Sequence, residues 1–273
     1  MKPMRPTSEK NSATKSILLY LALALVVLAA LAIRSIPATL ESPAHARGKT
    51  ETPAANEILA RFIQTETQFR ETLIHYSFKR DVVLQTIGAN GEVTGEYLRN
   101  SIFVLNDRGE RVEKVTFHPK STMKDLTITQ EDIQDLAGSQ LFGLELGDLN
   151  AYNLSYLTPA ELDGRLVHVI SIGPKQTPDP HHMKARFFVG KVYVDAETFQ
   201  AIKLEGITEP HGKQRFATFT THRSMIVSGL LVPSTTSADD VLHFPRKDVR
   251  YRISVRYYDF KKFASRVSIV ALD

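Results

Sequence analysis

The sequence predicts an α+β fold that is mostly antiparallel β: a curled half-barrel sheet capped by an N-terminal helix and a short helical insertion. Residues 56–74 have an amphipathic helical pattern, and the segments that follow alternate apolar and polar residues. Glycine-containing turns separate these segments, and Asn90-Gly91 is the strongest hairpin signal among them. The last segment has one apolar and one charged face, so its apolar side must be covered.

The predicted helix over residues 56–74 has one apolar face, formed by Ile58, Phe62, Phe69 and Leu73. Asn56 is a plausible N-cap, because its side chain can accept a hydrogen bond from the first turn. The pattern favours a helix that packs on a sheet over a helix that binds a partner.

Period-two patterning predicts strands along most of the remaining chain. Strands are expected over residues 75–86, 96–107, 111–119, 151–157, 165–173, 186–195, 199–207, 215–227 and 249–257. Thr129 and Asp132 have the spacing of a helix-capping pair and predict a short second helix. The acidic pair Asp239-Asp240 is interpreted as part of a loop.

So many strands with one apolar face need more cover than two short helices provide. Either the sheet closes into a barrel, or it curls into an open half-barrel with helices across its mouth. The order of the elements favours the half-barrel. No internal repeat is found, and a body of about 220 residues fits a single domain.

The N-terminal segment predicts export. An unbroken apolar run, residues 17–33, follows an n-region that carries Lys2, Arg5, Lys10 and Lys15. Its length lies between a signal-peptide core and a spanning helix, so cleavage and retention as an inner-membrane anchor both stay open. We therefore expect a signal peptide or signal-anchor helix over residues 1–34, a flexible linker over 35–55 and an extracytoplasmic, periplasmic domain over 56–273.

Charge and cysteine content exclude several classes of protein. The formal net charge is +4, but residues 47–273 hold 29 basic and 28 acidic residues, which argues against a nucleic-acid binder. The absence of cysteine excludes a disulfide scaffold, a thiolate metal site and a lipidated N-terminal cysteine.

The residues with catalytic or metal-binding chemistry all have simpler interpretations. No nucleophile elbow, zinc-protease motif or phosphate-binding loop occurs. His181-His182 lies in a proline-rich loop, and adjacent side chains of an extended segment point apart, so no metal site is predicted. His168 is expected to be a core histidine with its hydrogen bonds satisfied. We predict no enzyme activity and no cofactor.

The basic cluster near the C-terminus includes Arg250, Arg252 and Arg256. It is expected to be a solvated outer face of the sheet. The alternative is a surface for an anionic partner, either lipid headgroups or an acidic protein.

The order of elements, together with residues 190–206 (GKVYVDAETFQAIKLEG) and 251–263 (YRISVRYYDFKKF), resembles the LolA/LolB/RseB-like group of outer-membrane lipoprotein carriers and sensors. That resemblance implies a half-barrel whose concave apolar face holds acyl chains or an apolar peptide. The candidate lining residues are Val82, Leu84, Ile102, Val104, Val115, Phe117, Val192 and Val194. The competing interpretation is that these residues only fill a closed core.

The sequence thus favours an exported, non-enzymatic binding protein for a lipid, a lipoprotein acyl chain or another apolar ligand. The alternative is a membrane-tethered sensor or interaction module that docks a partner through its sheet. A retained anchor would favour the alternative, because an anchored protein cannot cross the periplasm as a shuttle.

Overall fold

The computed structural model describes residues 54–137, 143, 145–176, 186–209, 218–227, 229–244 and 247–263. All of them lie in one compact unit, Thr52–Asp273. The predicted export segment, nearly all of the predicted linker and the His181-His182 pair lie outside the described residues.

Ten strands of the described part form one antiparallel sheet in the order β3-β2-β1-β10-β9-β8-β7-β6-β5-β4. The strands are β1 (Tyr76–Ile87), β2 (Val93–Leu105), β3 (Arg111–Phe117), β4 (Tyr152–Leu162), β5 (Arg165–Pro174), β6 (Phe187–Asp195), β7 (Ala201–Glu209), β8 (Phe219–Val227), β9 (Leu230–Phe244) and β10 (Lys247–Lys262). Each strand after β3 pairs with the next one along the chain, and β10 returns to pair with β1. The predicted mostly antiparallel fold is confirmed.

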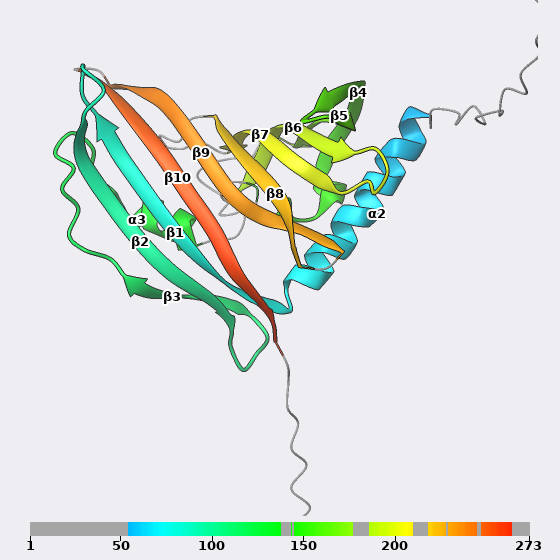
Figure 1. Cartoon of the computed structure of the whole chain (residues 1–273), viewed down its shortest axis with the longest axis horizontal. Helices are drawn as coiled ribbons and strands as arrows, with labels where there is room; N and C mark the ends of the chain where they lie inside the picture. Colours follow the sequence, from blue (N-terminus) through cyan, green and yellow to red (C-terminus); the bar gives the residue numbers. More distant parts are fainter. Residues whose placement is uncertain are drawn as a thin grey trace, which may run out of the picture. The chain divides into compact units, whose positions relative to one another are not determined.

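Helix α2 (Ala55–Leu73) runs along the β4–β8 part of the sheet, and the short helix α3 (Gln130–Ala137) lies beside β1 and β2 (Figure 1). The predicted apolar face of α2 is confirmed, because Ile58, Phe62, Phe69 and Leu73 are all buried. The prediction that Asn56 is the N-cap is wrong. The helix begins one residue earlier, so the cap position belongs to Ala54, which has no side-chain oxygen.

The turns follow the local sequence signals. Asp163 and Gly164 both have positive φ angles, 51° and 75°, as the tight β4–β5 hairpin requires. Thr129 and Asp132 cap α3 reciprocally: the Thr129 amide donates to the Asp132 carboxylate over 2.7 Å, and the Asp132 amide donates to the Thr129 hydroxyl over 3.2 Å. The predicted capping pair of the short helix is confirmed.

The prediction of a loop around Asp239-Asp240 is wrong, because both residues lie in β9, the long strand that the sequence did not reveal. Strand β9 carries Pro233 and several serine and threonine residues, which weaken a strand signal. Asp239 lies opposite Arg252 of β10 in the register. The cross-strand ion pairs that stabilise this arrangement cannot be read from β9 alone.

Two facing glycines let β6 and β7 approach closely. Gly190 pairs with Gly206 in the register, and a Cβ atom at either position would overlap backbone atoms of the other strand. Side chains cannot be accommodated there without moving the strands apart.

We expect Gly190→Ala to lower the free energy of unfolding by about 1–3 kcal/mol, because overpacking forces the backbone to shift. Gly173→Ala is the matched control in β5, since the nearest atom to its added Cβ is Val189 Cγ1 at 3.9 Å. Urea unfolding of both variants measures the difference, and equal stabilities would contradict the steric explanation.

Candidate functional site

The inner face of the sheet, defined as the face that carries the main core, is mostly apolar over β1, β2 and β10, although Arg80, Thr86, Arg99 and Ser101 are also buried on it. Its apolar side chains alternate with those of the opposite, outer face. They are Phe78, Val82 and Leu84 of β1, Tyr97 and Phe103 of β2, and Tyr251, Ile253, Val255 and Tyr257 of β10, each at most 2% exposed. This is the surface that the half-barrel prediction assigned to a ligand.

Residues 118–129 and α3, here called the cover, lie against this inner face. The cover is fixed to β2 at one end, where the Thr122 amide donates to the Glu96 carbonyl and the Glu96 amide donates to the Thr122 hydroxyl, both over 2.9 Å. Leu126 is 7% exposed and Leu136 is fully buried. A coil and a two-turn helix therefore shield this part of the core.

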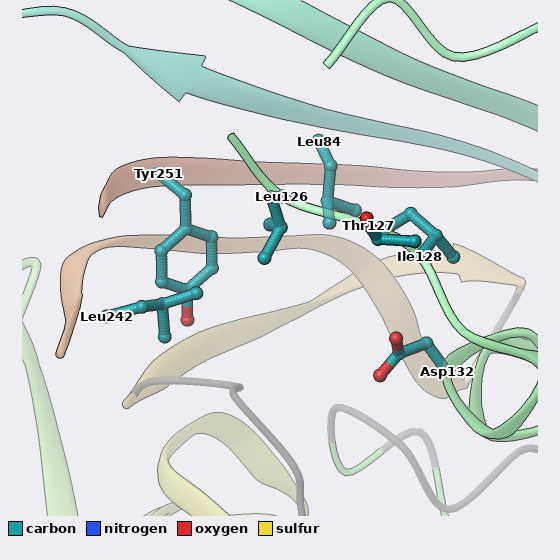
Figure 2. Close-up of a pocket in the computed structure, with 7 residues that line it drawn as sticks. All are labelled: Leu84, Leu126, Thr127, Ile128, Asp132, Leu242 and Tyr251. Carbon is teal, nitrogen blue, oxygen red and sulfur yellow. The ribbon is translucent and has the colours of Figure 1, made fainter. Parts of the chain in front are cut away.

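A small cavity remains between the cover and the sheet (Figure 2). Its lining residues are Leu84, Leu126, Thr127, Ile128, Asp132, Leu242 and Tyr251. The volume is about 10 Å³, which is enough for a single water-sized sphere and far too small for an acyl chain. In this conformation, the described part of the inner face is a filled core.

Larger hollows lie elsewhere and have mixed polar linings. One of about 420 Å³ is bordered by Asp163, Arg165, His222 and Met225, and one of about 290 Å³ lies between α2 and the β8–β9 turn. Neither joins the apolar inner face at the cover.

A buried ionic cluster lies beside the cover. Glu113 of β3 accepts hydrogen bonds from Arg99 Nη2 at 2.6 Å, Ser101 Oγ at 2.6 Å and Arg80 Nη2 at 3.3 Å. Arg80 also donates to the carbonyl of Leu136 in α3, which ties the cluster to the cover. These side chains lie within the core although they are charged, so each depends on its partners.

Burial and ion pairing shift the pKa values of these charged groups in opposite directions. Burial raises the pKa of Glu113, but hydrogen bonds from Arg99 and Ser101 and the charges of both arginines outweigh it, so the pKa lies below its ordinary value. For Arg80, burial lowers the pKa, and the neighbouring Tyr257 and Glu113 oppose that effect.

A second buried ion pair joins α2 to the sheet. Arg223 of β8 makes two hydrogen bonds of 2.7 Å to the two carboxylate oxygens of Glu66, and the side chains are only 1% and 4% exposed. The guanidinium also stacks on Phe69, 4.0 Å from the ring centroid. The sequence pattern indicates Glu66 only as a charged position beside the apolar stripe of the helix, and it does not indicate that Glu66 or Arg223 is buried.

The structure separates the predicted lining residues into two groups. Val82, Leu84, Val192 and Val194 are at most 2% exposed and belong to the main core. Ile102 and Val104 alternate with the buried Ser101 and Phe103, so they lie on the outer face, while Val115 and Phe117 on β3 are 44% and 52% exposed. That any of them contacts a ligand stays a prediction.

The predicted basic face is exposed and partly neutralised. Arg250 and Arg252 both contact Asp239, at 3.0 and 3.3 Å, and Arg256 contacts Asp81 at 3.0 Å. The hydrogen bond from Arg250 is the main reason that the pKa of Asp239 is lowered. Binding of an anionic partner to this face stays a prediction.

His168 is buried, as predicted, and its ring packs against Phe199 and Tyr156. Its hydrogen bonds are not fully satisfied within the described part of the chain, where Nδ1 has no partner. Burial lowers the pKa of this histidine. Among the described residues, no group of three or more His, Asp or Glu side chains could hold a metal ion.

Within the described residues, no helix is both long and apolar enough to span a membrane. The predicted export segment lies outside them.

Comparisons with known proteins give structural matches only. No family model matches the sequence, and no curated protein matches it. The structure matches a DUF1329 family protein from Desulfovibrio piger (10% identity, TM-score 0.40, covering 79% of this chain and 95% of that one). It also matches a LolA superfamily protein from Nitrosomonas europaea (12% identity, TM-score 0.34, covering 78% of this chain and 94% of that one). A third match is a putative outer membrane lipoprotein-sorting domain from Vibrio parahaemolyticus (9% identity, TM-score 0.35, covering 77% of this chain and 93% of that one). The group that the sequence resembles is therefore also found among the structural matches.

Proposed function

We propose that this protein is an exported, non-enzymatic binding protein that holds a lipid or a lipoprotein acyl chain against the inner face of its sheet. One observation carries the proposal: the apolar wall of β1, β10 and β2 is shielded by the cover. The predicted export segment places this binding outside the cytoplasm, with the protein either free in the periplasm or anchored by residues 17–33.

Because the cavity holds no more than one water-sized sphere, an acyl chain can enter only if the cover moves. The cover buries few apolar side chains, chiefly Leu126, Ile128 and Leu136. Exposing three such residues costs about 5–9 kcal/mol, whereas burying about fourteen methylenes of an acyl chain contributes about 11 kcal/mol. The difference, about 2–6 kcal/mol in favour of the acyl chain, is small enough for reversible binding.

The first test is native mass spectrometry of the full chain, expressed with its N-terminal segment and purified from the cell envelope. We expect a co-purified phospholipid or acylated peptide that organic solvent extracts. A clean apo mass, unchanged after incubation with phospholipid, would mean that the inner face is a permanently filled core and would overturn the proposal.

A glycine beneath the cover allows a second test. A Cβ atom added at Gly95 of β2 would lie 2.5 Å from Met123 Cα and 2.9 Å from Met123 N, so Gly95→Ala must displace the cover backbone. We expect the amide of Thr122 to lose protection against hydrogen exchange, and an apolar fluorescent probe to bind several-fold more strongly.

Gly173→Ala again provides the control, because its added Cβ meets only one side-chain atom, at 3.9 Å. If Gly95→Ala exposes no probe site while Thr122 loses protection, the cover does not guard a binding surface.

A further inference from the structure

Strand β3 forms one edge of the sheet, and no described strand pairs with its free side. Lys114, Val115, Thr116 and Phe117 are all exposed. At a free edge, backbone N–H and C=O groups of alternate residues have no partner strand, and they are a template for pairing with another chain.

The two edges of the sheet differ in how well they are protected against such pairing. Both edge strands have a register irregularity, but only β4 also contains a proline, Pro159, which has no N–H to donate. Strand β3 contains no proline. Its inward-facing charge, Glu113, is already engaged by Arg80 and Arg99 and does not face the free side.

Apolar side chains lie on both faces of this edge. Val115 pairs with Ser101 and shares its inner face, whereas a register shift places Phe117 opposite Asn100, which lies on the outer face. Their exposed fractions are 44% and 52%. A strand added beside β3 would therefore cover one apolar side chain on each face.

Positive charge surrounds the same edge. Lys114, Lys120 and Lys124 are exposed, and none of them forms an ion pair with a described residue. The nearby acids are engaged elsewhere, since Glu113 binds Arg99 and Asp125 contacts Lys247 at 2.6 Å. The chain beyond β3 continues along β2, because Thr122 bonds to Glu96, so Lys120 extends the line of the free edge. Lys124 lies farther away, because the chain crosses Gly95 at Met123 and Asp125 contacts Lys247 of β10.

We infer that the free side of β3 binds an extended polypeptide segment of a partner in which apolar and acidic residues alternate. The segment adds a strand to the sheet: its backbone bonds to β3, its apolar residues cover Val115 and Phe117, and its carboxylates face the lysines. A second copy of this chain is disfavoured, because β3 paired with itself brings two basic edges together. This inference does not depend on the acyl-chain proposal.

The probe for this site is a labelled eight-residue peptide in which valine and glutamate alternate. Fluorescence anisotropy with the full chain, purified from the cell envelope, measures its affinity. We expect binding that weakens steeply with added salt, and little binding of peptides that carry lysine in place of glutamate or a central proline. Hydrogen exchange should show new protection of amides in residues 111–117.

A matched pair of surface variants locates the site. Lys114→Glu with Lys120→Glu should weaken peptide binding about tenfold or more, which corresponds to about 1.4 kcal/mol. Lys175→Glu with Lys191→Glu makes the same change in net charge on exposed residues elsewhere, and it should leave the affinity within about twofold.

Four results would overturn the inference. One is an absence of peptide binding, and another is binding that leaves residues 111–117 unprotected. A third is protection of β3 that rises with protein concentration in the absence of peptide, which would make the edge an interface between copies of the chain. The last is lysine-dependent binding of phosphatidylglycerol vesicles without peptide binding, which would assign the lysines to a lipid surface.

Discussion

Replacing Glu66 with alanine is expected to lower the free energy of unfolding by about 3–5 kcal/mol, because it leaves the Arg223 guanidinium buried without its counter-charge. Arg223 makes two hydrogen bonds to Glu66, and its side chain is 1% exposed. Stacking on Phe69 cannot replace a carboxylate. Urea unfolding monitored by circular dichroism, with the slope compared between variants, gives the difference.

The same helix offers a matched control. Glu57 forms an i,i+4 ion pair with Arg61 at 2.5 Å, but both side chains are about half exposed. Glu57→Ala should therefore change the free energy of unfolding by no more than about 0.5 kcal/mol. If the two alanine variants lose the same stability, burial does not decide the strength of the Glu66–Arg223 pair.

A double variant separates the penalty of an unpaired charge from the value of the pair itself. Glu66→Leu combined with Arg223→Met replaces both charges by apolar side chains of similar length. Such replacements are often neutral or stabilising, so we expect the double variant to recover most of the loss. No recovery would mean that the pair fixes the position of α2 in a way that apolar packing cannot replace.

The positions of the two buried ion pairs show what the sequence could predict and what it could not. Glu66 lies eight residues after Ile58 and shares its helical face, and Arg80 lies between Phe78 and Val82 on the inner face of β1. Each charge thus interrupts an apolar pattern at a position that periodicity assigns to the core. That is a detectable signal of a buried charge.

The partners of those charges are beyond sequence reasoning. Glu66 and Arg223 are 157 residues apart, and Arg80 and Glu113 are 33 apart. Pairing them requires the strand order and the register, which follow from the packing of the whole sheet. The same reason explains β9, whose charges at Asp239 and Asp240 suggest a loop until Arg250 and Arg252 of β10 are placed beside Asp239.

Only some of the candidate lining residues face inward, because an alternating pattern shows that a strand has two faces but not which of them is buried. In β1 the residues chosen, Val82 and Leu84, face inward. In β2 the outward set, Ile102 and Val104, is as apolar as the inward set, which contains Arg99 and Ser101. For β2, choosing the more apolar face therefore selects the wrong one, because the inward face of this strand carries a polar cluster.

Removing the carboxylate of Glu113 is expected to lower the free energy of unfolding by as much as removing that of Glu66. Glu113→Ala leaves two buried guanidiniums, those of Arg80 and Arg99, without their shared partner, and about 3–5 kcal/mol of stability should be lost. Ser101→Ala removes only one hydrogen bond to the same carboxylate and should cost about 1–2 kcal/mol. Equal losses in the two variants would show that the arginines find other partners.

The pH dependence of stability gives an independent measure of this cluster. Since the pKa of Glu113 lies below its ordinary value of 4.5 in the folded state, its contribution is fully present above pH 4.5 and is lost as the pH falls through the lowered value. The wild type should therefore lose stability in acid more steeply than Glu113→Gln, which cannot titrate. Glu110→Gln, at an exposed turn before β3, is the control for the loss of one surface carboxylate.

The ionic cluster is also bonded to the cover, because Arg80 donates a hydrogen bond to the carbonyl of Leu136 in α3. If Glu113 holds Arg80 in place, Glu113→Gln should loosen α3 as well as lower the free energy of unfolding. Hydrogen exchange of α3 amides measures this effect, with Glu66→Ala as the comparison, since Glu66 is bonded to Arg223 of β8. Loosening of α3 in the Glu113 variant alone would make this ionic cluster the anchor that sets how easily the cover leaves the inner face.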